Sequence, residues 1–482
     1  MTASSNPDEI VFLSAEATSA AIRAGEFTAT DAVNAYLRRI DAIDGEIKSY
    51  ITVSREEALG AAADADEAMR RGDAEALGGA LFGVPVAVKD QFNTDGILTS
   101  NGSRAYADNV PAADATVVAR LKAAGAILLG KLNLSELAMG GTADPPYGTP
   151  QNPWRREHTP GESSSGSGAA LAAHLCAASV GEDTGGSGRG PASYCNAVGL
   201  RPTFTRISRH GITPMCWFMD AASPMTKTVQ DCALVLGAVA GYDPLDPTTS
   251  RRPVPDYYGM LMGDPPTADG MRVGRMTELC NSPDMHADVR RATDAALETL
   301  AGLGAEVIDV SLPLTEIAGA IFVGIADTEG AGARDGLMRR APESLDRASR
   351  TRLQSAALVP AKVQNRAMKA RVLLRRQFEE AFGQVDVLVS PTAPYPAPRH
   401  DALTAPFESA DDVRQRFFFR RSYTGCYPLA GMPAVSIPGG FTEDGLPIGL
   451  QLGGGPFAEA TILRAAYAYQ EATDWHTRRA PV

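Results

Sequence analysis

Short, continuous apolar runs alternate along this chain with stretches of helical periodicity. The runs over residues 82–88 and 126–129 are rich in Val, Ile and Leu, which favours strands buried on both faces. Residues 115–124, which lie between them, have the pattern of a helix. This order of strand, helix and strand predicts an α/β architecture.

Helical signals flank this region on both sides. Thr28, with the acidic Asp31 three residues later, predicts the capped start of a helix in the N-terminal part. Residues 168–180 are almost wholly apolar and rich in alanine, which predicts one buried helix. His174 is the polar exception within that stretch, and we interpret it as a core histidine rather than a catalytic one.

Strand patterns return near the C-terminus, over residues 385–390, 434–438 and 445–453. Asp444-Gly445, which lies between the last two, predicts a β-hairpin. The chain contains no internal repeat and no Gly/Ser linker that would divide it cleanly. We therefore predict one domain over residues 1–482.

Composition narrows the class of protein. Hydrophobic residues make up 44% and charged residues 21% of the 482 residues, which excludes a chain that is disordered throughout. The formal net charge of −12 argues against general binding to nucleic acid or anionic membranes, although it leaves room for a local basic patch. There is no apolar run of about 18 residues and no secretory signal pattern at Met1–Ile10. We therefore expect a cytoplasmic protein with no membrane partner.

The six cysteines are far apart and form no C-x-x-C pair, which is typical of reduced, buried thiols. The six histidines are equally scattered, so we expect no metal site.

Two Ser-rich loops and one lysine are the strongest candidates for chemistry. The loops cover residues 161–168 and 181–191, and Lys89 ends the first apolar run. A serine hydroxyl needs a base beside it to act as a nucleophile. Only about 0.04% of a lysine with an ordinary pKa is neutral at pH 7, but burial lowers that pKa. The glycines around Ser187 expose backbone N–H groups suited to an oxyanion hole. A glycine-rich turn and a solvated lysine explain the same residues, so both interpretations stay open on composition alone.

Three motifs, in this order along the chain, resemble those of the amidase signature family of serine hydrolases. They are Gly83-Val-Pro-Val-Ala-Val-Lys89-Asp90, Gly161-Glu-Ser163-Ser164-Ser-Gly-Ser167 and Asp183-Thr-Gly-Gly-Ser187-Gly-Arg189-Gly-Pro-Ala192. Further likeness covers nearly the whole chain and is weakest from about 240 to 380. The resemblance implies an α/β amidase-signature fold, with a large mixed central sheet covered by helices on both sides.

The resemblance also implies roles for individual residues. Ser187 is the nucleophile, Ser163 is a bridging serine that follows a cis peptide bond, and Lys89 is the base. The oxyanion hole is formed by the N–H groups of Thr184, Gly185, Gly186 and Ser187. The supporting residues are Asp183, Arg189 and Ser164. The candidates for the substrate pocket are Met139, Gly140, Trp217 and Tyr427.

Within the single amidase domain, the resemblance divides the chain into four parts. They are an N-terminal helical part over 1–75, a signature core over 76–235, a variable pocket-shaping region over 240–380, and C-terminal strands and a helix over 384–482. The function implied is hydrolysis of a non-peptide C–N bond in an amide, carbamate or ureido compound through a Ser187 acyl-enzyme. We expect no cofactor, a small-molecule amide or carbamate substrate and no nucleic acid; a homodimer is left open.

Three departures from the family pattern bear on the substrate. Glu162 and Ser165 each replace a glycine, and Gly188 replaces a β-branched residue. Ser165 and Gly188 are similar to the residues of members that act on urea-like or carbamate substrates, such as allophanate hydrolases, so a urethanase activity is among the expectations. Glu162 either contacts an amine or guanidine group of the substrate or is a solvated surface residue.

Two alternatives remain beside a free-standing amidase. One is the amidase subunit of a tRNA-dependent amidotransferase complex, to which the length and Asn152-Pro-Trp154 are similar. The other is a non-catalytic binding protein on the same fold, against which the presence of Lys89, Ser163 and Ser187 argues.

Overall fold

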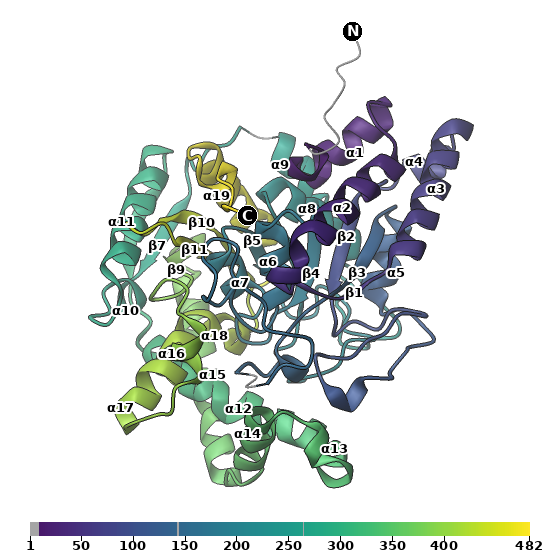
Figure 1. The fold of residues 1–482 in the computed structure, drawn as a ribbon. Helices are drawn as coiled ribbons and strands as arrows, with labels where there is room; N and C mark the ends of the chain where they lie inside the picture. The colour runs from purple at the N-terminus through teal and green to yellow at the C-terminus, as the bar shows by residue number, and fades with distance from the viewer. Residues whose placement is uncertain (1–8, 142–143, 264) are drawn as a thin grey trace.

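Eleven strands form one mixed sheet, with the order β1-β3-β2-β4-β6-β5-β10-β11-β9-β7-β8 (Figure 1). The computed structural model describes residues 9–141, 144–263 and 265–482. The strands are β1 (Tyr50–Val53), β2 (Pro85–Lys89), β3 (Ile127–Leu132), β4 (Ala178–Glu182), β5 (Val198–Arg201), β6 (Ala222–Thr226), β7 (Arg272–Met276), β8 (Glu306–Val310), β9 (Val387–Pro391), β10 (Ala434–Phe441) and β11 (Pro447–Gly453). The central strands are buried throughout, because helices cover both faces, and the predicted α/β fold is confirmed.

Helices surround the sheet on several sides. In Figure 1, α1, α2 and α3 lie at the top right and α12, α13 and α14 at the bottom, with strands between the two groups. The helices are α1 (Ala15–Ala24), α2 (Ala29–Ile47), α3 (Arg55–Arg71), α4 (Ala74–Leu77), α5 (Thr116–Ala123), α6 (Ser165–Ala172), α7 (Arg189–Tyr194), α8 (Val229–Val239), α9 (Tyr257–Gly263), α10 (Thr277–Cys280), α11 (Ala287–Gly302), α12 (Ala318–Ala333), α13 (Asp335–Arg340), α14 (Arg347–Ala357), α15 (Ala361–Ala381), α16 (His400–Thr404), α17 (Ala410–Val413), α18 (Arg420–Ala430) and α19 (Glu459–Glu471). Among the described residues, no helix combines the length and apolar character needed to cross a membrane.

Local sequence signals explain where several elements begin and turn. Thr28 caps α2 by accepting a hydrogen bond from the Asp31 N–H, and Asp31 in return accepts one from the Thr28 N–H, as predicted. The hairpin of β10 and β11 pairs Ala434 with Gly453 and turns at Gly445, whose φ of 87° suits a glycine.

The predicted helix over 168–180 is wrong in its second half. α6 ends at Ala172, His174 takes the left-handed conformation with φ 54°, and β4 begins at Ala178. Both halves are buried on all sides, so neither shows the one-sided pattern that separates helix from strand. His174 packs edge-on against Phe12, with 4.8 Å between ring centroids.

The register of two central strands determines what lies at one edge of the sheet. β2 and β4 are parallel neighbours that pair Val86 with Ala178 and Val88 with Val180. Their carboxyl ends therefore meet at the same edge, and Lys89 and Glu182 are the last residues of these two strands. The loops that follow β4 and precede α6 lie above this edge and carry the Ser-rich motifs.

Candidate active site

The three candidate catalytic residues converge on the carboxyl end of β2. Lys89 is fully buried, and its Nζ lies 2.8 Å from Ser163 Oγ and 3.3 Å from Glu182 Oε2. The Glu162–Ser163 peptide bond is cis, as predicted. Burial lowers the pKa of Lys89, because an ammonium group loses its hydration there.

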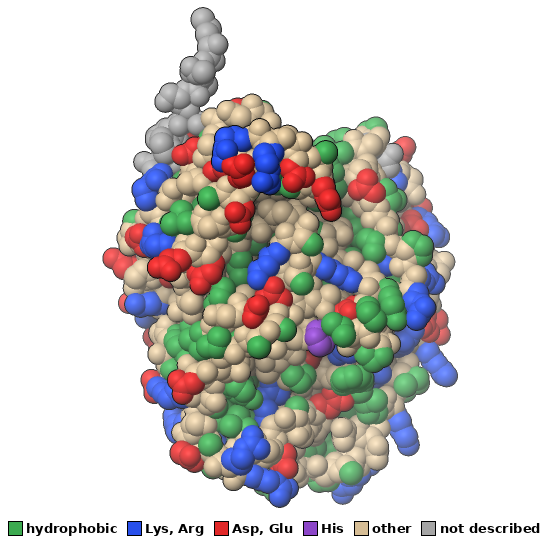
Figure 2. Space-filling model, turned by 90° about the vertical axis from the view of Figure 1, so that its right-hand side faces the viewer, with side chains coloured by type: hydrophobic (Ala, Val, Ile, Leu, Met, Phe, Trp, Pro, Cys, Tyr) green, Lys and Arg blue, Asp and Glu red, His purple; other side chains and the backbone are tan. Residues whose placement is uncertain are grey.

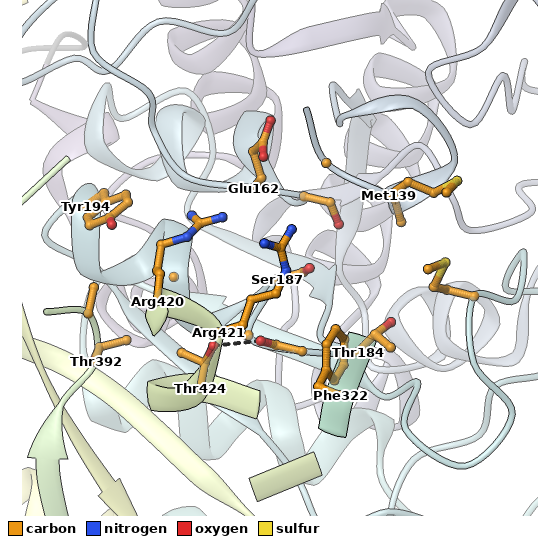
Figure 3. Close-up of a pocket in the computed structure, with 18 of the residues that line it drawn as sticks. Met139, Glu162, Thr184, Ser187, Tyr194, Phe322, Thr392, Arg420, Arg421 and Thr424 are labelled. Carbon is orange, nitrogen blue, oxygen red and sulfur yellow. Dashed lines mark hydrogen bonds between the residues drawn. The ribbon is translucent and has the colours of Figure 1, made fainter. Parts of the chain in front are cut away.

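Ser163 and Ser187 line one cavity, which opens to solvent (Figure 3). The two Ser-rich loops are joined by a hydrogen bond from the Ser164 N–H to the Ser187 carbonyl, 3.2 Å long. Within the part of the chain that the structure describes, no hydrogen bond joins the Ser163 and Ser187 hydroxyls, so one of the two predicted links of the relay is present. Lys89 lies behind Ser163 and does not line the cavity.

Asp183 fixes the loop that carries Ser187. Its carboxylate accepts two hydrogen bonds from the Arg189 side chain, both of 3.0 Å, and lies 3.4 Å from an Arg201 nitrogen. All three side chains are fully buried. Burial alone would raise the pKa of Asp183, but the two guanidinium groups hold it well below its usual range.

The four predicted oxyanion-hole residues differ in whether their N–H groups already donate a hydrogen bond within the protein. The Gly186 N–H donates to Asp183 Oδ1 over 2.9 Å and is already in use. Among the hydrogen bonds of the described residues, none engages the N–H groups of Thr184, Gly185 or Ser187. The Thr424 hydroxyl donates to the Gly185 carbonyl over 2.6 Å, drawn dashed in Figure 3, and so orients that peptide. Three of the four predicted donors therefore remain available to a ligand.

Two buried carboxyl groups lie next to the candidate lysine. Thr184 Oγ1 is 2.5 Å from Glu182 Oε1 and 2.7 Å from Asp220 Oδ1. Glu182 was not among the residues predicted from the sequence. No local signal pointed to it, because the residues before it were predicted to be helix, and only the pairing of β4 with β2 places Glu182 beside Lys89.

Three arginines that the sequence analysis did not single out also line the cavity: Arg352 of α14, and Arg420 and Arg421 at the start of α18. Arg352 donates to both oxygens of Asp327, over 2.9 and 2.5 Å. Across the described residues, no ion pair involves Arg420 or Arg421. Burial, followed by the charges of Arg352 and Arg420, lowers the pKa of Arg421 to about 9. Glu162 is the acidic residue among those that line the cavity. Figure 3 shows the guanidinium groups of Arg420 and Arg421 pointing toward the side of the cavity on which Glu162 lies.

The predicted pocket residues separate into two pairs. Met139 and Gly140 line the cavity. Trp217 lies outside it, 60% exposed, with its ring 4.9 Å from the Arg209 guanidinium. Tyr427 also lies outside it and is fully buried, because α18 directs it into the core against Phe378, 5.2 Å away between ring centroids.

Packing accounts for one departure from the family pattern. A Cβ atom added to Gly188 would lie 2.0 Å from Ser223 Oγ and 2.7 Å from Ser223 Cβ. Ser223 therefore fills the space that a β-branched residue at 188 would need. Glu162, another departure, accepts a hydrogen bond from the Gly141 N–H over 2.9 Å and lines the cavity.

A family model described as Amidase matches residues 31–463. The chain belongs to the amidase signature family. It is therefore an enzyme of amide C–N bond chemistry, as predicted, and the alternative of a non-catalytic binding protein loses its support.

The chain is also similar to individual proteins of known name. A glutamyl-tRNA(Gln) amidotransferase subunit of Geobacter metallireducens is 42% identical over 483 residues, which cover 95% of this chain and 96% of that protein. A solved protein from a vestigial complex that reveals the origins of an s-triazine catabolic enzyme is 32% identical, with a TM-score of 0.86 over 95% of this chain and 98% of its own. The peptide amidase of Stenotrophomonas maltophilia is 30% identical, with a TM-score of 0.83 over 97% and 98%.

These relatives correct the prediction about partners. We expected a small-molecule substrate and no nucleic acid, but relatives that match almost the whole chain are subunits of an enzyme named for a tRNA. The net charge is an average over the surface, and on the face drawn in Figure 2 Lys and Arg are interspersed with Asp and Glu. Between Arg334 and Arg376, Lys and Arg far outnumber Asp and Glu.

Proposed function

We propose that this amidase cleaves an amide C–N bond by nucleophilic attack of Ser187, with Ser163 and Lys89 relaying the proton. The observation that supports it most is the contact of 2.8 Å between a fully buried Lys89 Nζ and Ser163 Oγ, beside the cavity that Ser187 lines. A buried, neutral amine can accept a proton near neutral pH, whereas a solvated ammonium group cannot.

The residues divide the reaction between them. Ser187 Oγ attacks the amide carbonyl as its proton passes to Ser163 Oγ, while the Ser163 proton passes to Lys89 Nζ. The N–H groups of Gly185 and Ser187 donate to the oxyanion that forms. The same protons return to the leaving nitrogen, which departs as an amine or, from a primary amide, as ammonia. Water then hydrolyses the acyl-enzyme to a carboxylate and regenerates Ser187.

We also propose that the amide carries a carboxylate at its other end. Arg420 and Arg421, both half-buried, line the cavity without an ion-pair partner among the described residues, and a cation that is partly withdrawn from water favours an anion beside it. The class of substrate is therefore a primary amide with a carboxylate within reach of α18.

The relatives support a place for this chemistry in a larger assembly. We propose that the chain is the amidase component of a tRNA-dependent amidotransferase, since a relative of that name is 42% identical over 95% of the chain. In that role, the ammonia released at Ser187 is the nitrogen that the complex transfers.

Labelling and ammonia release test the chemistry. A fluorophosphonate probe is expected to modify Ser187, as located by mass spectrometry, and Ser187→Ala is expected to release no ammonia from primary amides. Labelling only at other residues, together with an active Ser187→Ala variant, would refute Ser187 as the nucleophile.

A matched pair of amides tests the carboxylate. Succinamic acid and butyramide differ in that one ends in a carboxylate and the other in a methyl group. We expect Arg421→Gln to reduce the preference for succinamic acid by about ten- to a hundredfold, the value of ~1.5–3 kcal/mol for a hydrogen bond to a charged group. Arg375→Gln on exposed α15 is the control and should leave the preference in place. An equal preference in the wild type and Arg421→Gln would contradict the assignment.

Reconstitution tests the assembly. Addition of the partner subunits of the Geobacter metallireducens amidotransferase, glutamyl-tRNA(Gln), an amide donor and ATP, which activates the glutamate carboxylate so that phosphate can leave, is expected to couple ammonia release to amidation of the tRNA-bound glutamate. If the chain alone hydrolyses amides at a rate that partners and tRNA leave unchanged, with no amidated tRNA, the proposed assembly fails while the amidase chemistry stands.

A further inference from the structure

The Thr184 hydroxyl lies between two buried carboxyl groups. Its oxygen is 2.5 Å from Glu182 Oε1 and 2.7 Å from Asp220 Oδ1, and all three residues are buried. A hydroxyl carries one hydrogen, so it can donate to only one of these oxygens. The other oxygen must carry a proton of its own, since two lone pairs facing each other at such a distance in a low-dielectric interior are strongly unfavourable.

The hydrogen-bond partners indicate which carboxyl group holds the proton. Asp220 accepts hydrogen bonds from the N–H groups of Met215, over 2.7 Å, and Cys216, over 2.8 and 2.9 Å to its two oxygens. Such donors stabilise the carboxylate form. Among the described residues, the Glu182 carboxyl group has no backbone donor and contacts only Lys89 and Thr184. The proton therefore belongs on Glu182.

We propose that Glu182 is a positioning residue that holds a proton in the resting enzyme and so keeps Lys89 neutral. The inference rests on the proposed role of Lys89 as the base. The proton passes from the Lys89 ammonium to the Glu182 carboxylate, which converts a buried ion pair into a neutral amine and a neutral acid. The pair gains and loses no proton in this exchange.

With Lys89 and Glu182 both neutral, each contact in the row from Ser163 to Asp220 has one donor and one acceptor. The Ser163 hydroxyl donates to Lys89 Nζ, and Lys89 donates an N–H to Glu182 Oε2. The proton on Glu182 Oε1 is donated to Thr184 Oγ1, and the Thr184 hydroxyl donates to Asp220. The contacts of 2.8, 3.3, 2.5 and 2.7 Å follow this order without a conflict. Ser163 is then already oriented to give its proton to the amine.

Burial favours the same distribution of protons. Burial raises the pKa of Glu182 to about 7, opposed by Lys89 and reinforced by Asp220. Burial lowers the pKa of Lys89, so the two groups shift in the directions that favour transfer. Burial also raises the pKa of Asp220, but its backbone donors oppose that shift.

Four further charged groups lie around Glu182: Asp183, Arg189, Arg201 and Arg334. Asp183 follows it in the chain and is itself neutralised by Arg189 and Arg201 of β5. Arg334, which follows α12, is the remaining buried cation whose charge reaches Glu182. The negative charge of Asp183 and the positive charges of the arginines shift the pKa of Glu182 in opposite directions. Desolvation therefore remains the main cause of its raised pKa.

Infrared difference spectroscopy tests where the proton is. The spectrum of wild type minus Glu182→Gln at pH 7 is expected to show the C=O band of a protonated carboxylic acid, which a carboxylate lacks. Glu298→Gln, at an exposed position of α11, is the matched control and should show only the loss of a carboxylate. A carboxylate band in place of the acid band at position 182 would overturn the proposal.

The pH dependence of turnover gives a second readout that a purely structural role would not produce. A glutamine at 182 resembles the protonated acid, so the acid limb of kcat/KM in Glu182→Gln should keep its midpoint although kcat falls. If Glu182 were instead a carboxylate, it would stabilise the Lys89 ammonium, and its removal would move that midpoint down by more than about one pH unit. Such a downward movement would refute the proposal.

Neutron diffraction of the wild type needs no variant, so it locates the proton on Glu182 or on Lys89 even if Glu182→Gln fails to fold. A deuteron on Glu182 Oε1 and two on Lys89 Nζ are expected, whereas three on Lys89 Nζ would overturn the assignment. The test is separate from that of the nucleophile: an active Ser187→Ala variant would refute the proposed function without moving this deuteron.

Discussion

Replacing Gly188 by alanine tests whether Ser223 is the reason that a glycine stands after Ser187. The backbone at Gly188 has φ −94° and ψ −48°, which any residue adopts, so available space alone decides the result. The new Cβ would lie 2.0 Å from Ser223 Oγ, which can rotate away only by giving up its bond of 2.8 Å to the Leu200 carbonyl. It would also lie 2.7 Å from Ser223 Cβ, which cannot rotate away.

The magnitude follows from these contacts. Overpacking costs about 1–3 kcal/mol and the lost hydrogen bond ~1 kcal/mol, so Gly188→Ala should lose ~2–4 kcal/mol of stability. With an unfolding entropy of ~2.1 cal/mol/K per residue, a chain of 482 residues loses about 1 °C of Tm per kcal/mol, which predicts a fall of ~2–4 °C. Adding Ser223→Gly removes both contacting atoms and should recover most of the packing loss.

Thermal unfolding of the wild type, both single variants and the double variant, at one heating rate, measures the coupling. Gly190→Ala, in the first turn of the helix that Gly188 precedes, is the matched control, because its Cβ would meet nothing closer than 3.9 Å, and its Tm should hold or rise slightly. If Gly188→Ala lowers the Tm equally in the wild-type and the Ser223→Gly backgrounds, steric exclusion by Ser223 is not the cause.

Three further predictions concern the candidate triad and its support. Lys89→Met should abolish most amide turnover, and the wild-type rate should rise with pH as Lys89 loses its proton; a flat profile with chemistry rate-limiting, together with an active Lys89→Met, would contradict this. Ser163→Ala should reduce kcat less completely than Ser187→Ala, since a water molecule can occupy the place of the lost hydroxyl, and equal losses in steady-state assays would argue against that substitution. Asp183→Asn leaves two buried guanidinium groups without their counter-charge and should cost ~3–5 kcal/mol, or about 3–5 °C in Tm. Because the folded pKa of Asp183 is held below its unfolded value of ~3.9, its contribution is complete above that pH and is lost as the pH falls below it; circular dichroism from pH 5 to 2 should show a smaller acid-induced loss in Asp183→Asn than in the wild type.

The fold was largely accessible from the sequence because its strands are short, apolar and β-branched. The runs that became β2 and β3, and the helix α5 between them, needed only local pattern. The stretch that became α6 and β4 could not be assigned from pattern, because alanine-rich segments buried on every side look alike as helix or strand. Only the pairing of β4 with β2 shows that the second half is a strand, and this pairing depends on the tertiary structure rather than on the local sequence.

Some residues of the candidate site could be predicted from the sequence, and others could not. The Ser-rich loops and Lys89 stand in contiguous motifs and could be found by resemblance. Arg352 and Arg421 could not, since they reach the cavity from α14 and α18, whose positions depend on helix packing far along the chain. Tyr427 shows the converse error: it stands beside a family motif, yet one helical turn directs it into the core.

The strand order also has a consequence for how the protein is made. The six strands formed first along the chain, β1 to β6, are contiguous in the sheet, and the five later strands, β7 to β11, occupy the other side, joined to them where β10 pairs with β5. Lys89, Ser163 and Ser187 all lie in the part that leaves the ribosome first, so their half of the sheet can assemble while α14 and α18 are still being translated. The candidate triad and the arginines that face it thus belong to two consecutive segments. A cut between β6 and β7 would separate them into fragments whose strands, among the described residues, pair only at β5 and β10 and which also pack together through α7, β10 and β11.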